Sequence, residues 1–585
     1  MPNGLQIGGL EVAEGATPGT AQWQGALGPS SQTTSTGTIV TVKQKDQQAI
    51  LNWKTLNIGK ETTLKFDQSD GGGDVGKWIA FNHIKDPSSN PTQILGKIEA
   101  PGQVYLINQN GIIFGGSSQV NVHTLTASTL PINSYLVSRG LLNNPDQQFL
   151  FSALAQPTGK NGSPAMTPDA PSNAAGITGD IEVQAGAQLT SPTSSDRVGG
   201  RIALIGGNVL QQGHISSPDG QIILAAGLQV GLSAHASDDP SLRGLDVAVG
   251  QVSDSSSAIY GRVINDGIIE AARANVSLAG RELSHNGVIS STTSVALNGR
   301  IDLLASYNAV SNSDSESSAK TPYLFSQSGH IELGKNAVIA LLPEWESSER
   351  TTNRTLALKS SIQAWGKTIY LNEQSSIVAP AADITFHAGN WKYLENESPP
   401  RSVFVHDQGQ IYLDHQALIH VAGSSDVNAS VADQFISAQL RASELADSPL
   451  LRDSLLRGST IYFDSTQTGE YNGKTWVGTP LADVSGYVNL IQRNVSQLTT
   501  AGGSISLQAG GSVVVREDAT LNVSGGWSNV AGATVQTTRL LSDGKLIDIA
   551  SATPDRAYQA IVASNRSLLN SLSLIHISEP TRPRL

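Results

Sequence analysis

Val104-Tyr-Leu-Ile-Asn-Gln-Asn-Gly-Ile-Ile-Phe-Gly-Gly-Ser-Ser-Gln-Val-Asn-Val-His123 is the most informative stretch of this chain. Its two apolar runs, residues 104–107 and 112–114, are short and β-branched or aromatic, as in strands. Asn108-Gln109-Asn110-Gly111 separates them, and Asn-Gly supplies the positive φ that a tight turn needs. A β-hairpin and a corner between successive strands of a β-solenoid both fit this pattern.

Segments on either side of this stretch carry further motifs. In order and spacing they closely resemble the amino-terminal secretion domain of the filamentous-haemagglutinin-like exoproteins of two-partner secretion, over residues 3–140. The segments are Ile50-Leu-Asn-Trp-Lys-Thr-Leu-Asn-Ile-Gly59, Thr63-Leu-Lys-Phe-Asp-Gln68, Trp78-Ile-Ala-Phe-Asn82, Asn90-Pro-Thr-Gln-Ile-Leu-Gly96 and Val120-Asn-Val-His-Thr-Leu-Thr-Ala-Ser-Thr-Leu130.

The resemblance implies export through an outer-membrane β-barrel transporter and marks residues that recognise it or shape the recognised fold. These residues are Asn108, Gln109, Asn110, Gly111, Ile112, Asn52, Trp53, Asn57 and Gly59. Gln109 stands where the family has Pro in Asn-Pro-Asn-Gly-Ile, and His83 stands where Arg often follows Ala-Phe-Asn. Two interpretations of the turn remain open: a buried structural turn, or direct contact with the periplasmic domains of the transporter.

The composition favours a glycine-punctuated β architecture. The 585 residues include 58 Gly, only 15% charged and 5% aromatic residues, and no Cys, so stability must come without disulfides. A net charge of -12 and the lack of a long basic run argue against a nucleic-acid or anionic-membrane partner. No run of 18 apolar residues and no secretory leader occur in the sequence, so we expect that a signal peptide is missing before Met1.

A short motif recurs from Gly176 onward: an apolar–polar–apolar triplet followed by a small residue. Two spacings, 202−181 = 21 and 222−202 = 20, indicate a solenoid with a strand in each repeat. The alternation places Ile222 and Leu224 inward and Ile223 outward. The triplets are Ile181-Glu-Val183, Ile202-Ala-Leu204, Ile222-Ile-Leu224, Val276-Ser-Leu278, Val295-Ala-Leu297, Ile301-Asp-Leu303, Ile331-Glu-Leu333, Ile369-Tyr-Leu371, Ile384-Thr-Phe386, Ile411-Tyr-Leu413, Ile461-Tyr-Phe463 and Ile505-Ser-Leu507.

We therefore predict an all-β chain that forms a right-handed parallel β-helix (solenoid), with a β-sandwich array as the alternative. Residues 176–530 would make roughly 18 coils along about 85 Å of axis. Residues 5–40 are expected to cap the first coil, because an open edge invites aggregation. Small insertions outside the helix complete the prediction.

The expected organisation has four parts. Residues 1–250 form the secretion domain with cap and first coils, and residues 251–530 the shaft, with insertions near 308–322, 391–401 and 431–457. One or two short helices are predicted within residues 435–457 from apolar residues at helical spacing. Residues 531–570 begin a further exoprotein body. Residues 571–585 resemble a translated sequencing adapter, so the natural chain is expected to continue differently after about Asn570.

Catalytic chemistry was sought because polysaccharide-degrading enzymes share the β-helix. Asp414 and Asp464 follow strand-like triplets and Asp407 lies beside His406, but turn capping explains these positions better than a carboxylate pair. His415 and His420 lack metal-ligand spacing. We therefore expect no catalytic residues, no metal and no cofactor.

The sequence predicts a secreted or surface-exposed Gram-negative exoprotein that acts as an adhesin or haemagglutinin. Its expected partners are the transporter and a receptor or glycan on a host cell or another cell. Two alternatives remain: a β-helical polysaccharide-active enzyme, and the carrier of a contact-dependent toxin.

Overall fold

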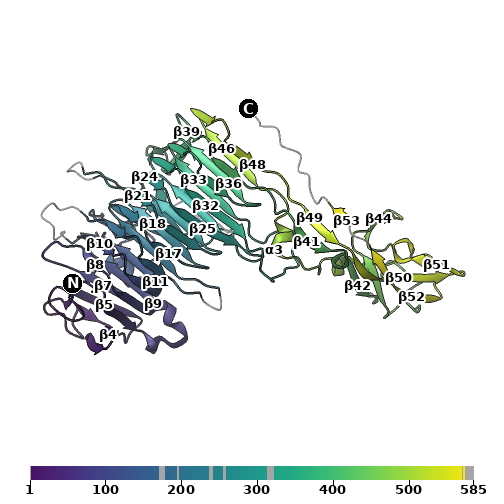
Figure 1. The fold of residues 1–585 in the computed structure, drawn as a ribbon, viewed down its shortest axis with the longest axis horizontal. Helices are drawn as coiled ribbons and strands as arrows, with labels where there is room; N and C mark the ends of the chain where they lie inside the picture. The colour runs from purple at the N-terminus through teal and green to yellow at the C-terminus, as the bar shows by residue number, and fades with distance from the viewer. Residues whose placement is uncertain are drawn as a thin grey trace.

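A parallel β-helix forms most of the molecule (Figure 1). The computed structural model describes residues 2–169, 178–193, 197–235, 242–253, 258–312, 322–568 and 571–573. One face of the helix is a ten-stranded parallel sheet. Its strands are β8 (Thr92–Ile94), β10 (Ile112–Phe114), β13 (Ile181–Val183), β16 (Val209–Gln211), β21 (Arg262–Asn265), β24 (Glu282–His285), β31 (His330–Leu333), β34 (Thr368–Leu371), β39 (Gln410–Leu413) and β47 (Ser512–Val515).

Two further rows of parallel strands close each coil. The first row continues from β9 (Lys97–Ile107) and β11 (Gln119–Ser128) through β14 (Gln188–Thr190), β17 (His214–Ser216), β22 (Ile268–Ala271), β25 (Val288–Thr293), β32 (Val338–Pro343), β35 (Ser376–Val378), β40 (Leu418–His420) and β48 (Thr520–Asn522). The second row pairs the later halves of β9 and β11 with β15 (Arg201–Gly206), β18 (Gln221–Ala226), β23 (Asn275–Ala279), β26 (Arg300–Leu304), β33 (Ser361–Gly366), β36 (Asp383–Ala388) and β46 (Ser504–Ala509).

The core is a set of ladders in which like residues stack from coil to coil. Val104 pairs with Leu125, which pairs with Ile202. The same ladder then runs through Ile222, Val276, Ile301, Ile362, Ile384 and Ile505. Every second side chain of each strand points inward, and together these side chains form one continuous apolar core. This arrangement confirms the predicted parallel β-helix.

The opening stretch forms a corner and not a hairpin. Strands β9 and β10, on either side of residues 108–111, belong to different sheets: β10 pairs with β8 and β13, whereas β9 pairs with β6 (Thr62–Asp67), β7 (Ile79–Ile84) and β11. The turn therefore carries the chain from one face of the helix to the next.

The predicted number of coils was too high. Of the ten strands in the sheet, β8 and β10 precede residue 176, so eight coils, not 18, lie in residues 176–530. Three of these coils carry a triplet on two faces (residues 181 and 202, 369 and 384, 411 and 505), and excursions between strands use many residues. Two triplets were also misassigned: residues 295–297 form no strand, and β43 (Thr460–Asp464) pairs antiparallel with β42 (Phe435–Gln439) outside the helix.

Antiparallel strands lie at the amino-terminal end of the helix, where a cap is expected. β1 (Leu10–Val12) and β2 (Trp23–Gln24) pair antiparallel with β5 (Gln48–Leu56). β3 (Ser30–Thr34) pairs antiparallel with β4 (Gly37–Lys43), which is parallel to β6. The change of direction ends the parallel stacking at this edge.

A second layer covers part of the outer surface of the helix. β12 (Phe151–Ser152), β19 (Gln229–Ala234) and β20 (Leu245–Val249) form a small antiparallel sheet, and α1 (Ser134–Ser138) packs beside it. Ile223 points out of the coil but is fully buried in this layer. The predicted outward direction of Ile223 is therefore confirmed, but the second layer covers the side chain.

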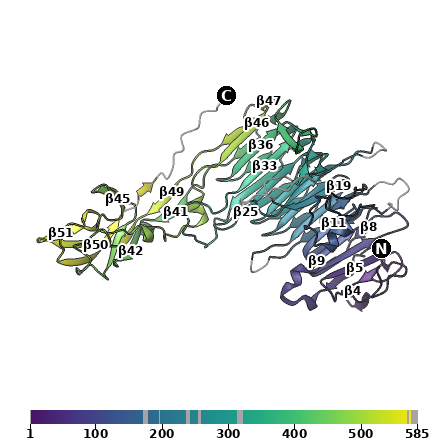
Figure 2. The same ribbon diagram turned by 180° about the vertical axis from the view of Figure 1, so that it is seen from behind.

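Residues 427–498 and 528–568 form a lobe at the carboxyl-terminal side of the helix, visible from both sides in Figures 1 and 2, while β46, β47 and β48 between them belong to the last coil. β41 (Val427–Ser430) pairs with β49 (Ser528–Ala531). β50 (Ala533–Ser542), β51 (Lys545–Asp548) and β52 (Ala560–Leu568) form an antiparallel sheet. Its other elements are η2 (Val431–Gln434), β44 (Thr468–Tyr471), β45 (Lys474–Val477), α2 (Ser485–Val488), α3 (Val495–Leu498), η3 (Ile549–Ser551) and β53 (Ser571–Ser573).

The helices predicted within residues 435–457 are absent from this described part of the chain. Phe435–Gln439 is strand β42, and turns follow it, with Leu445, Leu451 and Leu456 buried in the core of the lobe. Near 391–401, β37 (Asn390–Leu394) and β38 (Arg401–Val405) form a hairpin. The segments 313–321 and 574–585 of the expected insertion and adapter lie outside the described residues. None of the described helices is long and apolar enough to cross a lipid bilayer.

Candidate functional site: the corner before β10

Asn108 is the centre of the corner, and its side chain is 1% exposed. Its Nδ2 donates to Oγ1 of Thr92 at 3.0 Å, and its Oδ1 accepts from the backbone N–H of Asn110 at 3.0 Å. Its backbone carbonyl accepts from the N–H of Gly111 at 3.1 Å, which closes the turn. Both ends of the amide are therefore used within the protein, as buried polar groups require.

Gly111 and Ile112, which follow the two asparagines, are buried. Gly111 has φ +119°, and a Cβ there would lie 3.1 Å from Cβ of Pro91 and 3.3 Å from the carbonyl oxygen of Asp180. The predicted positive φ is thus observed, and glycine is required by conformation as well as by space. Ile112 is fully buried in the core ladder.

The side chains of Gln109 and Asn110 are half-buried and reach other segments of the chain. Nε2 of Gln109 donates to the carbonyl of Asp169 at 3.2 Å, and Nδ2 of Asn110 donates to the carbonyl of Asp86 at 3.2 Å. The backbone carbonyl of Gln109 accepts from the N–H of Gly179 at 2.7 Å. The corner is therefore the point at which several loops are joined.

The second predicted group, in residues 52–59, lies on β5 and the turn after it. Oδ1 of Asn57 accepts from the N–H of Gln93 at 2.9 Å, and its Nδ2 donates to the carbonyl of Gly8 at 3.1 Å. Nδ2 of Asn52 donates to the carbonyl of Gln22 at 2.9 Å. These amides fasten the amino-terminal cap and β8 to β5.

Gly59 and Trp53 are buried in the same region. A Cβ on Gly59 would lie 2.2 Å from Oδ1 of Asn3, so the cap approaches too closely for any side chain. Nε1 of Trp53 donates to Oδ1 of Asn82 at 2.9 Å, and its ring meets Trp23 edge-on at 5.2 Å. The structure thus brings residues 52–59 and 108–112 together through β8, but it does not place them on one exposed surface.

Asn82 and Thr92 complete the network, although they were not among the predicted site residues. Nδ2 of Asn82 donates to the carbonyl oxygens of Tyr105 at 3.0 Å and Ala80 at 3.2 Å. Both residues fall within motifs recognised in the sequence, namely residues 78–82 and 90–96. Asn82 is the polar residue at the end of an otherwise apolar motif, which was a signal that the sequence offered for it, whereas Thr92 stands beside other polar residues and had no such signal.

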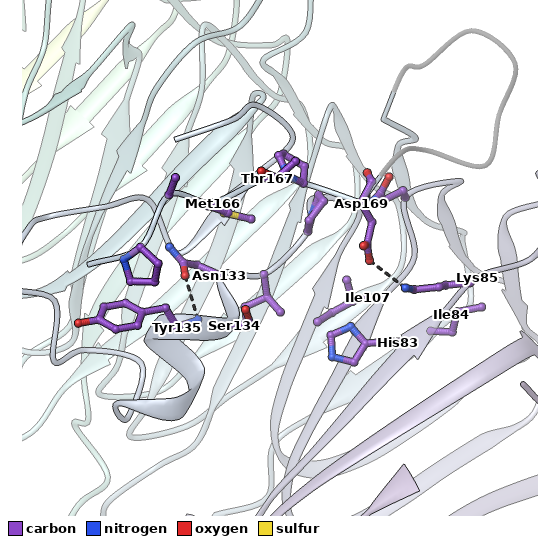
Figure 3. A pocket seen from close by; sticks show the side chains of 16 residues that line it. His83, Ile84, Lys85, Ile107, Asn133, Ser134, Tyr135, Met166, Thr167 and Asp169 are labelled. Carbon is purple, nitrogen blue, oxygen red and sulfur yellow. Dashed lines mark hydrogen bonds and ion pairs between the residues drawn. The ribbon is translucent and has the colours of Figure 1, made fainter. Parts of the chain in front are cut away.

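A pocket of about 590 Å³ opens beside the corner, between β7, the end of β9 and the start of α1 (Figure 3). His83, Gln109 and Asn133 line it, together with Lys85 and Asp169, which form an ion pair at 3.0 Å. Burial, and then the charge of Lys85, lower the pKa of His83 to about 4, so its imidazole is neutral at pH 7. A ligand in this pocket could form hydrogen bonds and apolar contacts with the lining side chains. These side chains do not form a recognisable catalytic arrangement.

Comparison with known proteins identifies this region. The family profile described as "TPS secretion domain" matches residues 13–270, which include the corner, β5, β8 and the first coils. The chain carries a secretion domain of the two-partner secretion (TPS) type.

Two curated proteins share part of the sequence with this chain. One heme/hemopexin-binding protein of Haemophilus influenzae is 32% identical over 127 residues, which cover 20% of this chain and 13% of the relative. A second, from strain ATCC 51907 / DSM 11121 / KW20 / Rd, is 33% identical over 93 residues, covering 16% and 10%. The chain thus matches about an eighth of their length or less.

A solved structure is also similar to this chain. The HMW1 secretion domain from Haemophilus influenzae aligns with a TM-score of 0.43 at 19% identity, over 70% of this chain and 86% of that one. The fold described above stands on the strand pairings of the chain itself.

The carboxylates and histidines considered for catalysis have local roles. Oδ1 of Asp414 accepts from the N–H of His415 at 2.8 Å, and Oδ1 of Asp464 accepts from the N–H of Thr466 at 2.9 Å. Asp407 lies 3.7 Å from Nζ of Lys392 in an ion pair. Nδ1 of His420 accepts from the N–H of Ala422 at 3.4 Å. These contacts support the turn-capping interpretation for Asp414 and Asp464.

Proposed function

We propose that residues 52–59 and 108–112 serve export by fixing the shape of the folded secretion domain, and not by direct contact with the transporter. The observation that carries this proposal is the orientation of Asn108, whose amide is buried and bonded at both ends. Asn57 and Trp53 likewise direct their polar atoms to the chain itself. Few of these polar groups are therefore accessible for direct contact with the transporter.

On this proposal the chain crosses the periplasm unfolded and folds outside the cell. Each folded coil presents an edge of unpaired backbone N–H and C=O groups, on which the next coil can pair, so folding favours outward movement. The corner before β10 is an early commitment point, because it joins the cap-bearing part of the chain to the first strands of the ten-stranded sheet.

We also propose that the exported protein is an adhesin. The support is its form: a long β-helix that carries a separate lobe of loops and short strands at the side away from the amino-terminal cap (Figure 1). Loops displayed on a rigid scaffold are common sites of recognition. The receptor is taken up below.

The export proposal is tested with the whole chain behind a signal peptide, co-expressed with its outer-membrane transporter. Asn108→Ala and Asn57→Ala are compared with wild type for the amount in the medium and for the free energy of unfolding of purified protein. Export that falls in step with stability supports the shape proposal. Loss of export with unchanged stability would show direct contact instead, and periplasmic retention of wild type would contradict both.

A further inference from the structure

Trp345 is exposed where large aromatic residues are normally buried. It follows β32 and is 48% exposed, whereas Trp23 and Trp53 are 0% exposed. It lines a concavity of about 510 Å³ between the β-helix and the lobe, together with Ser425, Asp426, Asn428, Asn494 and Ser496. That volume lies within the usual range of ligand pockets, about 300–1,000 Å³.

The indole is held in place from two sides. Its Nε1 donates to Oγ of Ser424 at 3.0 Å, and that oxygen also shares a hydrogen bond of 2.8 Å with Oγ1 of Thr499. The preceding residue, Glu344, forms an ion pair with Arg273, and its N–H donates to the carbonyl of Thr293 at 2.9 Å. The polar edge of the ring is therefore bound to protein while about half of the side chain remains accessible.

The opposite wall is equally well supported. Asn494 caps α3 by accepting from the N–H of Gln497 at 3.0 Å. Asn428 lies on β41, which is paired with β49. The loop that carries Trp345 is joined to this wall where Thr351 and Arg493 exchange two backbone hydrogen bonds of 2.8 and 2.7 Å. A ligand would thus meet a pre-ordered site and lose little affinity to ordering it.

The lining has the chemistry of a saccharide site. A sugar ring has an apolar C–H face, which can stack on an aromatic ring, and vicinal hydroxyls, which pair with planar amide and carboxylate groups. The pocket offers one indole beside Asp426, Asn428 and Asn494. None of the described residues that line it is Lys or Arg, and the chain carries a net charge of -12, so an acidic sugar would be unfavourable.

We propose that this pocket binds a neutral saccharide unit of a cell-surface glycan. The proposal rests on the adhesin role given above and names the class of ligand for it. An apolar peptide is the weaker fit, because Trp345 and Val427 are the apolar residues among the described lining. A packing role for Trp345 would leave it buried.

The test uses the purified full chain and five neutral probes: lactose, maltotriose, cellotriose, mannotriose and triacetylchitotriose, with 3′-sialyllactose as the acidic counterpart of lactose. Binding is followed by saturation-transfer NMR and calorimetry. We expect saturable binding of at least one neutral probe. If lactose binds, 3′-sialyllactose should bind more weakly than lactose. Trp345→Ala and Asn428→Ala should weaken binding about tenfold or more.

Asn529→Ala is the matched control. Asn529 is the exposed register partner of Asn428 on β49 but does not line the pocket, so its removal should leave affinity unchanged. Trp345→Phe keeps an aromatic face and should bind better than Trp345→Ala. No saturable binding of any neutral probe at millimolar concentration, or equal affinity in wild type and Trp345→Ala, would overturn the proposal.

Failure of this inference can be told apart from failure of the adhesin role. Attachment of the purified wild-type chain to cultured epithelial cells is measured in parallel with probe binding. If Trp345→Ala attaches to the cells as well as wild type does, the saccharide site is not what mediates adhesion. The adhesin role itself is not contradicted by that result. Saccharide binding without any attachment contradicts the adhesin role alone.

Discussion

Asn57 and Asn108 hydrogen-bond to neighbouring residues of one short strand, β8. Oδ1 of Asn57 accepts from the N–H of Gln93, and Nδ2 of Asn108 donates to Oγ1 of Thr92. The two sequence motifs that mark the secretion domain are thereby linked through three residues of the first strand in the ten-stranded sheet. Residues of both motifs therefore hold β8 in place through hydrogen bonds.

Asn108→Ala should lower the free energy of unfolding by about 1–3 kcal/mol, because it leaves the buried hydroxyl of Thr92 and the N–H of Asn110 without this partner. Gln109→Ala is the control, since it removes a single half-buried side-chain bond and should cost less. Urea denaturation of purified protein measures both. Equal midpoints for the two variants would contradict the central role given to Asn108.

Gly111→Ala should destabilise the protein by about 1–3 kcal/mol, because φ +119° is a region that side chains rarely adopt and the new Cβ would crowd Pro91. Gly73→Ala is a matched control in an exposed segment, where nothing lies within 4 Å of the added Cβ. Differential scanning calorimetry of both variants checks the difference. A melting temperature for Gly111→Ala no lower than that for Gly73→Ala would count against this reading of the turn.

Leu224→Asp should cost at least ~3 kcal/mol, since it buries an unpaired carboxylate in the core ladder. Ile223→Thr should also be costly, about 1–3 kcal/mol, because the second layer covers that side chain. Ile7→Thr, at a side chain that is 88% exposed, should be close to neutral. Denaturation midpoints that group Ile223→Thr with Ile7→Thr would show that the second layer is not packed on β18.

The pH dependence of stability should carry a contribution from His83. Its pKa is about 4 when folded and 6.5 as the ordinary value, so the unfolded chain binds the proton more readily between these limits. The contribution is therefore fully present above pH 6.5 and is lost as pH falls toward 4. His83→Gln should flatten the stability–pH curve in that window by ~2 kcal/mol relative to wild type. Parallel curves for the two proteins would refute the assignment.

The sequence predicts the ladders well, because period-2 alternation is set locally by each strand. Ile222 and Leu224 lie where alternation places them, and Gly111 has the positive φ that Asn-Gly indicates. What local pattern cannot supply is the neighbour across space. Ile223 reads as a surface residue until β19 and β20 fold over it, and Ile461 reads as a coil residue although it pairs with β42.

The candidate site shows the same division. The turn at residues 108–111 was predictable from its own composition, whereas the partner of Asn108 is Thr92, on the strand one coil below. The helical spacing of apolar residues in 435–457 was misleading because a compact core of turns can bury the same Leu residues. Trp345 carried no sequence signal, since its exposure depends on where the lobe lies.

Ile202 stacks directly on Ile222, 222−202 = 20 residues later in the chain. The length of the shaft is therefore set by the number of coils that the gene encodes. A coil touches mainly the coil above and the coil below, so an in-frame duplication of one such unit would add about 4.8 Å to the shaft and preserve every existing ladder. Recombination that adds or removes a coil is therefore a route to longer or shorter molecules. Selection can then set the distance between the lobe and the amino-terminal end without redesigning either.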